Sequence, residues 1–226
     1  MSLPERHLVK ICGLSSEETL RAALEAGADM VGLVFFEKSP RHVSLAQARA
    51  LASLARGRAA IVALTVNAGD GEIDAIRAGV QPDLFQLHGS ETPERVRAVA
   101  DRTGAAVMKA LGVSGVADLA AAPAYAAVGA RLLLDAKPPK DAVLPGGNGA
   151  TFDWSILEKL DPSLAFMLSG GLDSANVARA IEIARPAGVD VSSGVESAPG
   201  VKDISRIKAF VAQARVGFAS LEAPRP

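Results

Sequence analysis

The stretch LVKICGLSSEETLRAALEAGADMVGLVFF, residues 8–36, contains two short apolar runs separated by a segment with helical spacing. The runs LVKIC and MVGLVFF are rich in branched aliphatic residues and show little alternation with polar ones, which is typical of parallel strands covered on both faces. Between them, Ser15 and Glu18 fit a capping box that would begin a helix. The stretch therefore predicts a strand, a helix and a second, parallel strand.

The same unit recurs along the chain. The eight predicted strands are LVKIC from Leu8, MVGLVFF from Met30, AIVALTV from Ala60, LFQLH from Leu84, AVMKAL from Ala106, RLLLD from Arg131, AFMLS from Ala165 and VDVSS from Val189. Further helix starts are expected at Ser44 with Gln47 and at Thr92 with Pro93. Core-facing helical stripes are formed by Val177, Ala180, Ile181 and Ala184, and by Ile204, Ile207, Phe210 and Val211.

Eight strand and helix units in strict alternation predict an α/β fold, a (β/α)₈ TIM barrel, as a single domain over residues 1–226. An open doubly wound sheet is the alternative, although the first turn, ICGLSS, lacks the G-x-G-x-x-G fingerprint that many such sheets carry. Residues 217–226 lose helical periodicity, so we expect this tail to be frayed.

Composition narrows the classes of partner. The 226 residues carry a formal net charge of −1 with both signs spread along the chain, which argues against binding to nucleic acid or to an anionic membrane. The single cysteine cannot form an internal disulfide, and the start MSLPERH has no apolar signal core, so a cytoplasmic location is expected. No apolar run approaches the roughly 20 residues of a membrane helix. Neither His7 nor His42 has a partner at metal-ligand spacing, so no metal site is expected.

Two residues at predicted strand ends are candidates for catalysis. Cys12 ends the first strand and Asp135 ends the sixth, and the carboxyl ends of barrel strands are where catalytic groups gather. Cys12 has the alternative of being a small buried hydrophobic residue. Asp135 closes an apolar run, where an unpaired carboxylate is costly, so it is solvated, partnered or poised for proton transfer. Its alternative is a structural cap of the following loop.

Glycine-rich turns follow the seventh and eighth strands, in LSGGLDSANVARAI and VDVSSGVE. Glycine lets backbone N–H groups approach an anion, a helix N-terminus favours negative charge, and many barrels bind phosphate after these two strands. The predicted phosphate-binding residues are Gly170, Gly171, Ser192, Ser193 and Gly194. The partner is therefore expected to be a small phosphorylated molecule.

Other polar residues lie near the expected barrel mouth. Arg41, after the second strand, suits a substrate carboxylate, with an ordinary surface charge as its alternative. His88, at the end of the fourth strand, either orients substrate or fixes its own loop. Lys10 and Lys109 lie within strands, and the sequence leaves open where they point. The loop AKPPKDAVLPGGNGATFDW after Asp135 is long enough to be a lid with glycine hinges, or a loop without function.

In order and spacing, the motifs VKICGL, FFEKSPRHVS, FQLHGSE, LLLDAK, GGNGATFDW, LSGGLD and VDVSSGVE resemble the phosphoribosylanthranilate isomerase family of tryptophan biosynthesis, over nearly the whole chain. The resemblance implies an Amadori rearrangement of N-(5-phosphoribosyl)anthranilate without external cofactor. It also implies Asp135 as general acid, Cys12 as general base, Arg41 as the anthranilate carboxylate ligand and Asp190 as a substrate-positioning residue. Asn148 departs from the threonine common in the family, which leaves the kinetics of the lid open.

Two other functions remain in view. A histidine-pathway or bifunctional phosphoribosyl isomerase would act on a two-phosphate substrate, but that family carries aspartate in place of Cys12. Its second phosphate site needs a glycine-rich turn after the third or fourth strand, for which TVNAGDGE is the only candidate. A catalytically silent barrel that binds a phosphometabolite is the other alternative. The sequence is compatible with a monomer and with a homodimer.

Overall fold

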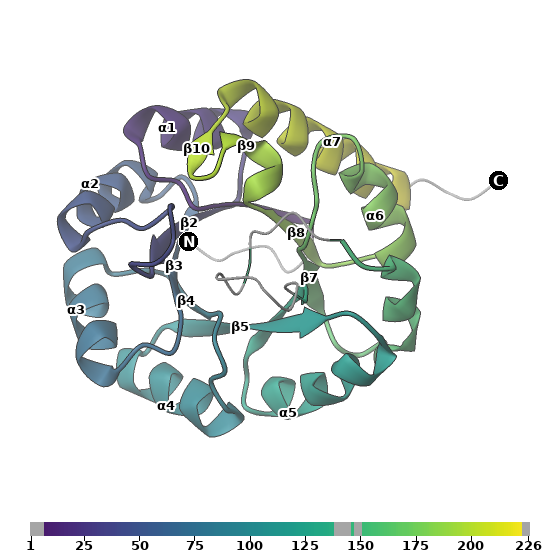
Figure 1. Cartoon of the computed structure of the whole chain (residues 1–226), viewed down its shortest axis with the longest axis horizontal. Coiled ribbons are helices and arrows are strands. Elements are labelled where there is room, and N and C mark those ends of the chain that lie inside the picture. The colour runs from purple at the N-terminus through teal and green to yellow at the C-terminus, as the bar shows by residue number, and fades with distance from the viewer. Residues whose placement is uncertain (1–6, 138–145, 147–150, 223–226) are drawn as a thin grey trace.

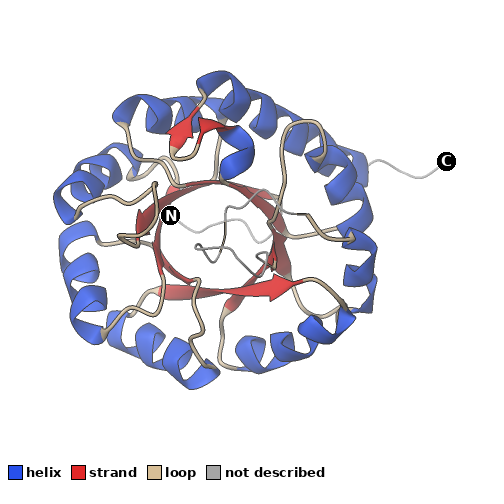
Figure 2. Cartoon of the chain, in the orientation of Figure 1, coloured by secondary structure: helices blue, strands red, loops and turns tan. Residues whose placement is uncertain are grey.

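The strands of the computed structural model, which describes residues 7–137, 146 and 151–222, close into a parallel barrel surrounded by helices (Figures 1 and 2). Strand β1 pairs with both β2 and β8, so the ring is complete and the predicted TIM barrel is confirmed over the open sheet. The barrel strands are β1 (Leu8–Cys12), β2 (Met30–Phe35), β3 (Ala60–Thr65), β4 (Leu84–Leu87), β5 (Ala106–Val113), β6 (Arg131–Ala136), β7 (Phe166–Leu168) and β8 (Gly188–Val191).

The helices connect successive strands on the outside of the barrel. They are α1 (Glu17–Ala26), α2 (Leu45–Ala55), α3 (Asp70–Val80), α4 (Pro93–Thr103), α5 (Ala122–Ala127), α6 (Val177–Ala184) and α7 (Ile204–Glu222), with shorter 3-10 helices at Val116–Ala121, Trp154–Lys159 and Ser193–Val195. Thr92 caps α4 and Ser44 caps α2, as predicted, because each side chain accepts the N–H of the residue three positions on.

Alternation along each strand separates two apolar layers. Inside the barrel lies a cluster of Leu8, Met30, Ala60, Val62, Leu84, Met108, Ala110, Leu133 and Met167. A larger cluster, which includes Val9 and Ile11, fills the space between strands and helices. Because successive side chains point to opposite faces, Lys10 and Cys12 share the inner face of β1 with Leu8. The apolar layer inside the barrel thus lies below polar groups near its mouth.

The first helix begins one residue later than the capping box predicts. Ser16, not Ser15, is the N-cap of α1, and its hydroxyl accepts the N–H of Thr19 at 3.3 Å. The carbonyl of Ser15 is already engaged, since it accepts the side-chain amide of Gln47 from α2 at 2.6 Å. The bond across to α2 ties down the residue before the cap.

The prediction of a frayed tail from residue 217 is wrong for residues 217–222, the part of that tail that the structure describes. Helix α7 continues through Glu222, and Phe218 is buried with its ring stacked on His7 at 4.8 Å between centroids. Gly217 does not end the helix. A Cβ there would lie 2.9 Å from the Cα of Ala178, so this glycine allows α7 to pack closely on α6.

A small hairpin follows β8 and was not predicted. Its strands are β9 (Glu196–Ala198) and β10 (Val201–Lys202), and it lies outside the barrel ring close to α1 and α7 (Figure 1). The hairpin carries Glu196 and Lys202 to the edge of the barrel mouth. Within the described ranges, no helix combines the length and the apolar composition needed to cross a bilayer.

Candidate active site

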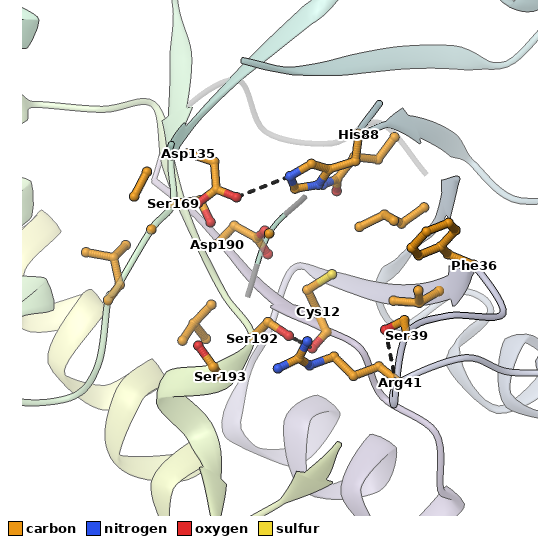
Figure 3. A pocket seen from close by; sticks show the side chains of 18 of the residues that line it. Cys12, Phe36, Ser39, Arg41, His88, Asp135, Ser169, Asp190, Ser192 and Ser193 are labelled. Carbon is orange, nitrogen blue, oxygen red and sulfur yellow. Dashed lines mark hydrogen bonds and ion pairs between the residues drawn. The ribbon is translucent and has the colours of Figure 1, made fainter. Parts of the chain in front are cut away.

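The carboxyl ends of the strands surround a cavity with about 770 Å³ of empty space, its open side included. Its lining includes all of the predicted site residues except Gly194, namely Cys12, Arg41, His88, Asp135, Gly170, Gly171, Asp190, Ser192 and Ser193. The side chains of Cys12, Asp135 and Asp190 lie around one space in Figure 3. The topology has therefore gathered residues from both ends of the sequence.

Cys12 ends β1 and is only 4% exposed, with its sulfur on the inner face of the strand. The hydroxyl of Ser192 donates to the carbonyl of Cys12 at 3.2 Å and holds the strand end in place. Burial raises the pKa of the thiol, while the nearby ammonium of Lys10 lowers it; the net direction is upward. The neutral thiol is therefore favoured more than in water.

Lys10 points into the barrel, which answers the question that the sequence left open. Its side chain is fully buried, and Nζ donates to Asp190 Oδ1 at 2.8 Å. The two residues stand opposite each other in the register of β1 and β8. Burial lowers the pKa of Lys10, but the charges of Asp190 and Cys12 raise it, and the net direction is upward. Lys10 is thus an ammonium beneath the cavity.

Asp135 ends β6 and is held by His88. The carboxyl is 4% exposed, and His88 Nε2 lies 3.2 Å from its Oδ2 (Figure 3). The other ring nitrogen, Nδ1, lies 3.1 Å from the side-chain amide nitrogen of Gln86. If that amide donates to Nδ1, the ring proton is on Nε2 and is directed at Asp135. Gln86 and His88 thereby fix the orientation of the carboxyl group.

Gly146 lies next to this pair. A Cβ at this position would be 2.8 Å from His88 Nε2 and 2.9 Å from Asp135 Oδ2. The absence of a side chain therefore leaves the carboxyl face accessible from the cavity. Asn148 and the rest of residues 147–150 in the predicted lid motif lie outside the described residues, as do residues 138–145.

The turn after β7 has the backbone expected of a phosphate-binding loop. Gly170 and Gly171 have positive φ values of 92° and 61°, conformations that favour glycine. Among the described residues, neither amide N–H has a hydrogen-bond acceptor. Two amides at a cavity wall, with Ser192 and Ser193 across from them, form a place for an anion.

Helix α6, which follows this turn, was expected to direct its N-terminal amides at the anion, and it does not. Helix α6 begins only at Val177, with Asn176 as N-cap. The amides before it are already used, because Asp173 Oδ1 accepts the N–H groups of Ala175 and Asn176. Among the described residues, the glycine turn rather than the start of α6 therefore offers unbound amide N–H groups to the cavity.

Gly194, in the loop after β8, packs against the loop that follows the glycine turn of β7. A Cβ there would lie 1.9 Å from the carbonyl oxygen of Leu172, so the two turns pack backbone against backbone. Only glycine fits this approach. Gly194 was predicted to bind phosphate, and the structure places it where the loops after β7 and β8 are joined.

Arg41 is buried in an ion pair that sequence reasoning missed. Its Nε and Nη2 donate to the two carboxylate oxygens of Glu196 at 2.7 and 2.9 Å. Lys202 donates to the same carboxylate at 2.7 Å and to the carbonyl of Ser192 at 2.8 Å. Burial raises the pKa of Glu196, but Arg41 and Lys202 lower it, and the net direction is downward. The only signal in the sequence was an acidic residue soon after the last barrel strand.

Lys109 points away from the cavity. Its ammonium lies among the loops outside the barrel and donates to the carbonyls of Leu87 and Gly89 and to Glu91 Oε2. It ties the loop after β4 to β5. In the part of the chain that is described, no group of three His, Cys, Asp or Glu residues is arranged to hold a metal ion.

A family model and several known proteins similar to this chain carry the same name. The family model described as N-(5'phosphoribosyl)anthranilate (PRA) isomerase matches residues 9–213. A protein of that name from Azorhizobium caulinodans is 59% identical over 212 residues, which cover 94% of this chain and 93% of that one.

Solved structures agree with the sequence relatives. The phosphoribosyl anthranilate isomerase of Thermotoga maritima superposes with a TM-score of 0.81 at 38% identity, over 92% of this chain and 98% of that one. A structure of the same enzyme type in complex with reduced 1-(o-carboxyphenylamino)-1-deoxyribulose 5-phosphate gives a TM-score of 0.78 at 36% identity, with the same coverage. The Thermotoga maritima enzyme is also described as dimeric.

Proposed function

Because the chain belongs to the N-(5'-phosphoribosyl)anthranilate isomerase family, we propose that Cys12 and Asp135 divide the proton transfers of that isomerisation between them. The reaction is an aldose–ketose isomerisation in tryptophan biosynthesis. It converts N-(5-phosphoribosyl)anthranilate to 1-(2-carboxyphenylamino)-1-deoxyribulose 5-phosphate. The observation that carries the proposal is the placement of a thiol from β1 and a carboxyl group from β6 in one cavity beside an anion cradle.

Two proton transfers are needed, and they act on different atoms of the sugar. Asp135 gives a proton to the ribose ring oxygen as the bond from that oxygen to C1 breaks, and the anthranilate nitrogen forms a double bond to C1. The Cys12 thiolate then takes the proton from C2, and the C2–H electrons form an enolamine. The enolamine tautomerises to the C2 ketone. One acid and one base at separate positions satisfy this sequence.

The binding groups fit the two ends of the substrate. The glycine turn after β7, with Ser192 and Ser193, supplies N–H donors for the phosphate. Arg41 is proposed to bind the anthranilate carboxylate, with Glu196 fixing the plane of its guanidinium group. Asp190 and His88 are proposed to position the sugar and the acid. Each assignment is supported by the lining of the cavity.

Gly170 offers a test of the cradle. We expect Gly170→Ala to raise KM several-fold or more, because φ is +92° there and a Cβ would lie 2.4 Å from the amide nitrogen of Ala136. Overpacking of this kind also costs about 1–3 kcal/mol of folding stability. Steady-state kinetics and thermal unfolding measure the two effects. Gly115→Ala is the matched control, since a Cβ there meets no atom within 4 Å. An unchanged KM in Gly170→Ala would refute the proposal that this glycine turn binds the phosphate.

The histidine-pathway alternative needs a second anion site near β3 and β4, where the amides of Asn67, Gly89 and Ser90 are already bound within the protein. Glu91 accepts the N–H groups of Asn67 and Gly89 at 2.8 and 2.9 Å. The side chain of Asn67 in turn accepts the N–H of Ser90 at 2.8 Å. An internal carboxylate therefore already holds amides that a second phosphate would need. This arrangement favours a one-phosphate substrate.

Activity is tested directly with purified protein. We expect it to consume N-(5-phosphoribosyl)anthranilate with loss of substrate fluorescence, and to turn over the two-phosphate histidine precursor far less efficiently. Binding of a product analogue without turnover would instead support the silent barrel. Comparable efficiency on both substrates would support a bifunctional enzyme.

The proposed role of Cys12 also bears on the cellular location of the enzyme. A mechanism that uses a free thiol suits the reducing cytoplasm.

A further inference from the structure

Lys10 Nζ and Cys12 Sγ both pack against one point of the neighbouring strand at the inner face of the barrel. That point is Gly32, which pairs with Cys12 in the register of β1 and β2. A Cβ on Gly32 would lie 2.8 Å from Cys12 Sγ and 3.2 Å from Lys10 Nζ. The ammonium and the sulfur therefore lie on either side of the position that a Gly32 side chain would take, close enough to interact with each other.

The buried pair of Lys10 and Asp190 is poorly explained as a stabilising device. Replacing a buried ion pair with apolar residues is often neutral or favourable, so such a pair points to another use. Within the described residues, the only oxygen to which Lys10 Nζ donates is Oδ1 of Asp190. An ammonium has three donors, which leaves N–H groups for the sulfur of Cys12.

Lys109 shows what a structural lysine looks like in the same barrel. It is also a strand residue, is 2% exposed and forms an ion pair with Glu91 at 3.0 Å. Its ammonium, however, is bound by two backbone carbonyls as well, and it lies outside the barrel. Lys10 has no such carbonyl partners and lies beneath the site.

We propose that Lys10 is a positioning residue for the reaction, whose ammonium pairs with the thiolate of Cys12 and so enlarges the small fraction of thiolate that burial leaves at neutral pH. The inference rests on the proposed role of Cys12 as base. When the thiolate takes the C2 proton it becomes a neutral thiol, and Lys10 keeps its three protons throughout. Asp190 holds the ammonium in place and in its charged form.

Other charged groups near Cys12 act in both directions. Asp190 from β8 raises the pKa of the thiol. Lys202 from β10 lowers that pKa, with a smaller effect than Lys10. Arg41, His88 and Asp135 line the same cavity, whereas the β2 residues next to Cys12, Gly32 and Val34, carry no charge. Lys10 is the largest lowering influence, opposing the burial that raises the thiol pKa.

The single cysteine makes a direct measurement available, because alkylation by iodoacetamide reports Cys12 alone. The midpoint of the alkylation rate against pH gives the thiol pKa, and it does not depend on how easily the reagent enters. We expect Lys10→Met to raise that midpoint by about one to three units. The rate at pH 7 should fall by up to about tenfold for each unit.

Lys10→Met leaves Asp190 buried without its partner, so a second variant keeps every charge. Gly32→Ala inserts a methyl group between Sγ and Nζ and should also raise the alkylation midpoint. Lys109→Met is the matched control, since it removes a buried strand lysine far from the thiol and should leave the midpoint unchanged. If Lys10→Met does not fold, Gly32→Ala carries the test alone.

Turnover separates this inference from the function it rests on. In both variants the pH profile of kcat/KM should move upward together with the alkylation midpoint. A raised midpoint with an unmoved profile would support the pairing and refute Cys12 as base. An unchanged midpoint in every folded variant would overturn the inference, whatever the turnover.

Discussion

Replacing Asp135 with asparagine is expected to lower kcat/KM by about 10²–10⁴-fold, the range typical of a lost general acid. The amide keeps the size of the side chain, and its oxygen can still accept from His88 Nε2, which lies 3.2 Å from the carboxylate in the parent protein. What it loses is the proton for the ribose ring oxygen. Steady-state assays by fluorescence measure the effect.

The matched control for this change is Asp118→Asn. Asp118 lies in the 3-10 helix Val116–Ala121 after β5, pairs with Lys137 at 2.9 Å and does not line the cavity. We expect its replacement to change kcat/KM by no more than a few-fold. Equal activities of Asp135→Asn and the parent would remove Asp135 from the mechanism.

Replacing Cys12 with alanine is expected to have an effect of similar size, about 10²–10⁴-fold on kcat/KM. The reason is the loss of the acceptor for the C2 proton. The cavity left by one sulfur is small, so folding should survive, and thermal unfolding of the variant checks this. Cys12→Ser is the second variant, because it keeps a polar atom at the same position without a thiolate.

The dependence on pH identifies the thiol as the source of that loss. Burial raises the pKa of Cys12, so only a small fraction is thiolate at neutral pH, and that fraction grows as the pH rises. In the parent enzyme, kcat/KM should therefore rise with pH through the neutral range. The residual activity of Cys12→Ala should lack this rise. A variant that kept the parent's rate and slope would contradict the assignment.

Much of the barrel could be predicted because its strands are continuous apolar runs. Each run, from LVKIC to VDVSS, contains the core of an observed strand. The details that failed depend on packing between distant residues. Ser16 replaces Ser15 as the N-cap where Gln47 binds the Ser15 carbonyl, and Gly217 continues a helix because α6 leaves no room for a side chain. Neither contact is visible in local sequence.

The candidate site, too, could be predicted from the sequence only in part. Cys12 and Asp135 could be singled out because each ends a strand, and barrel strands end at one mouth. The pairing of Arg41 with Glu196 joins residues 155 positions apart through a short hairpin that has no periodic signal. The direction of Lys10 depends on the closure of β1 against β8. Register and closure, which arise only in the folded chain, decide these partners.

The central claim, that Cys12 and Asp135 serve different atoms of one bound sugar, is tested most directly by a crystal structure with the reduced product analogue bound. We expect the phosphate on the amides of Gly170 and Gly171, Cys12 Sγ in contact with C2, and a carboxyl oxygen of Asp135 within hydrogen-bond distance of the oxygen on C4. A ligand bound with C2 turned away from the sulfur, or with Asp135 remote from that oxygen, would contradict the account.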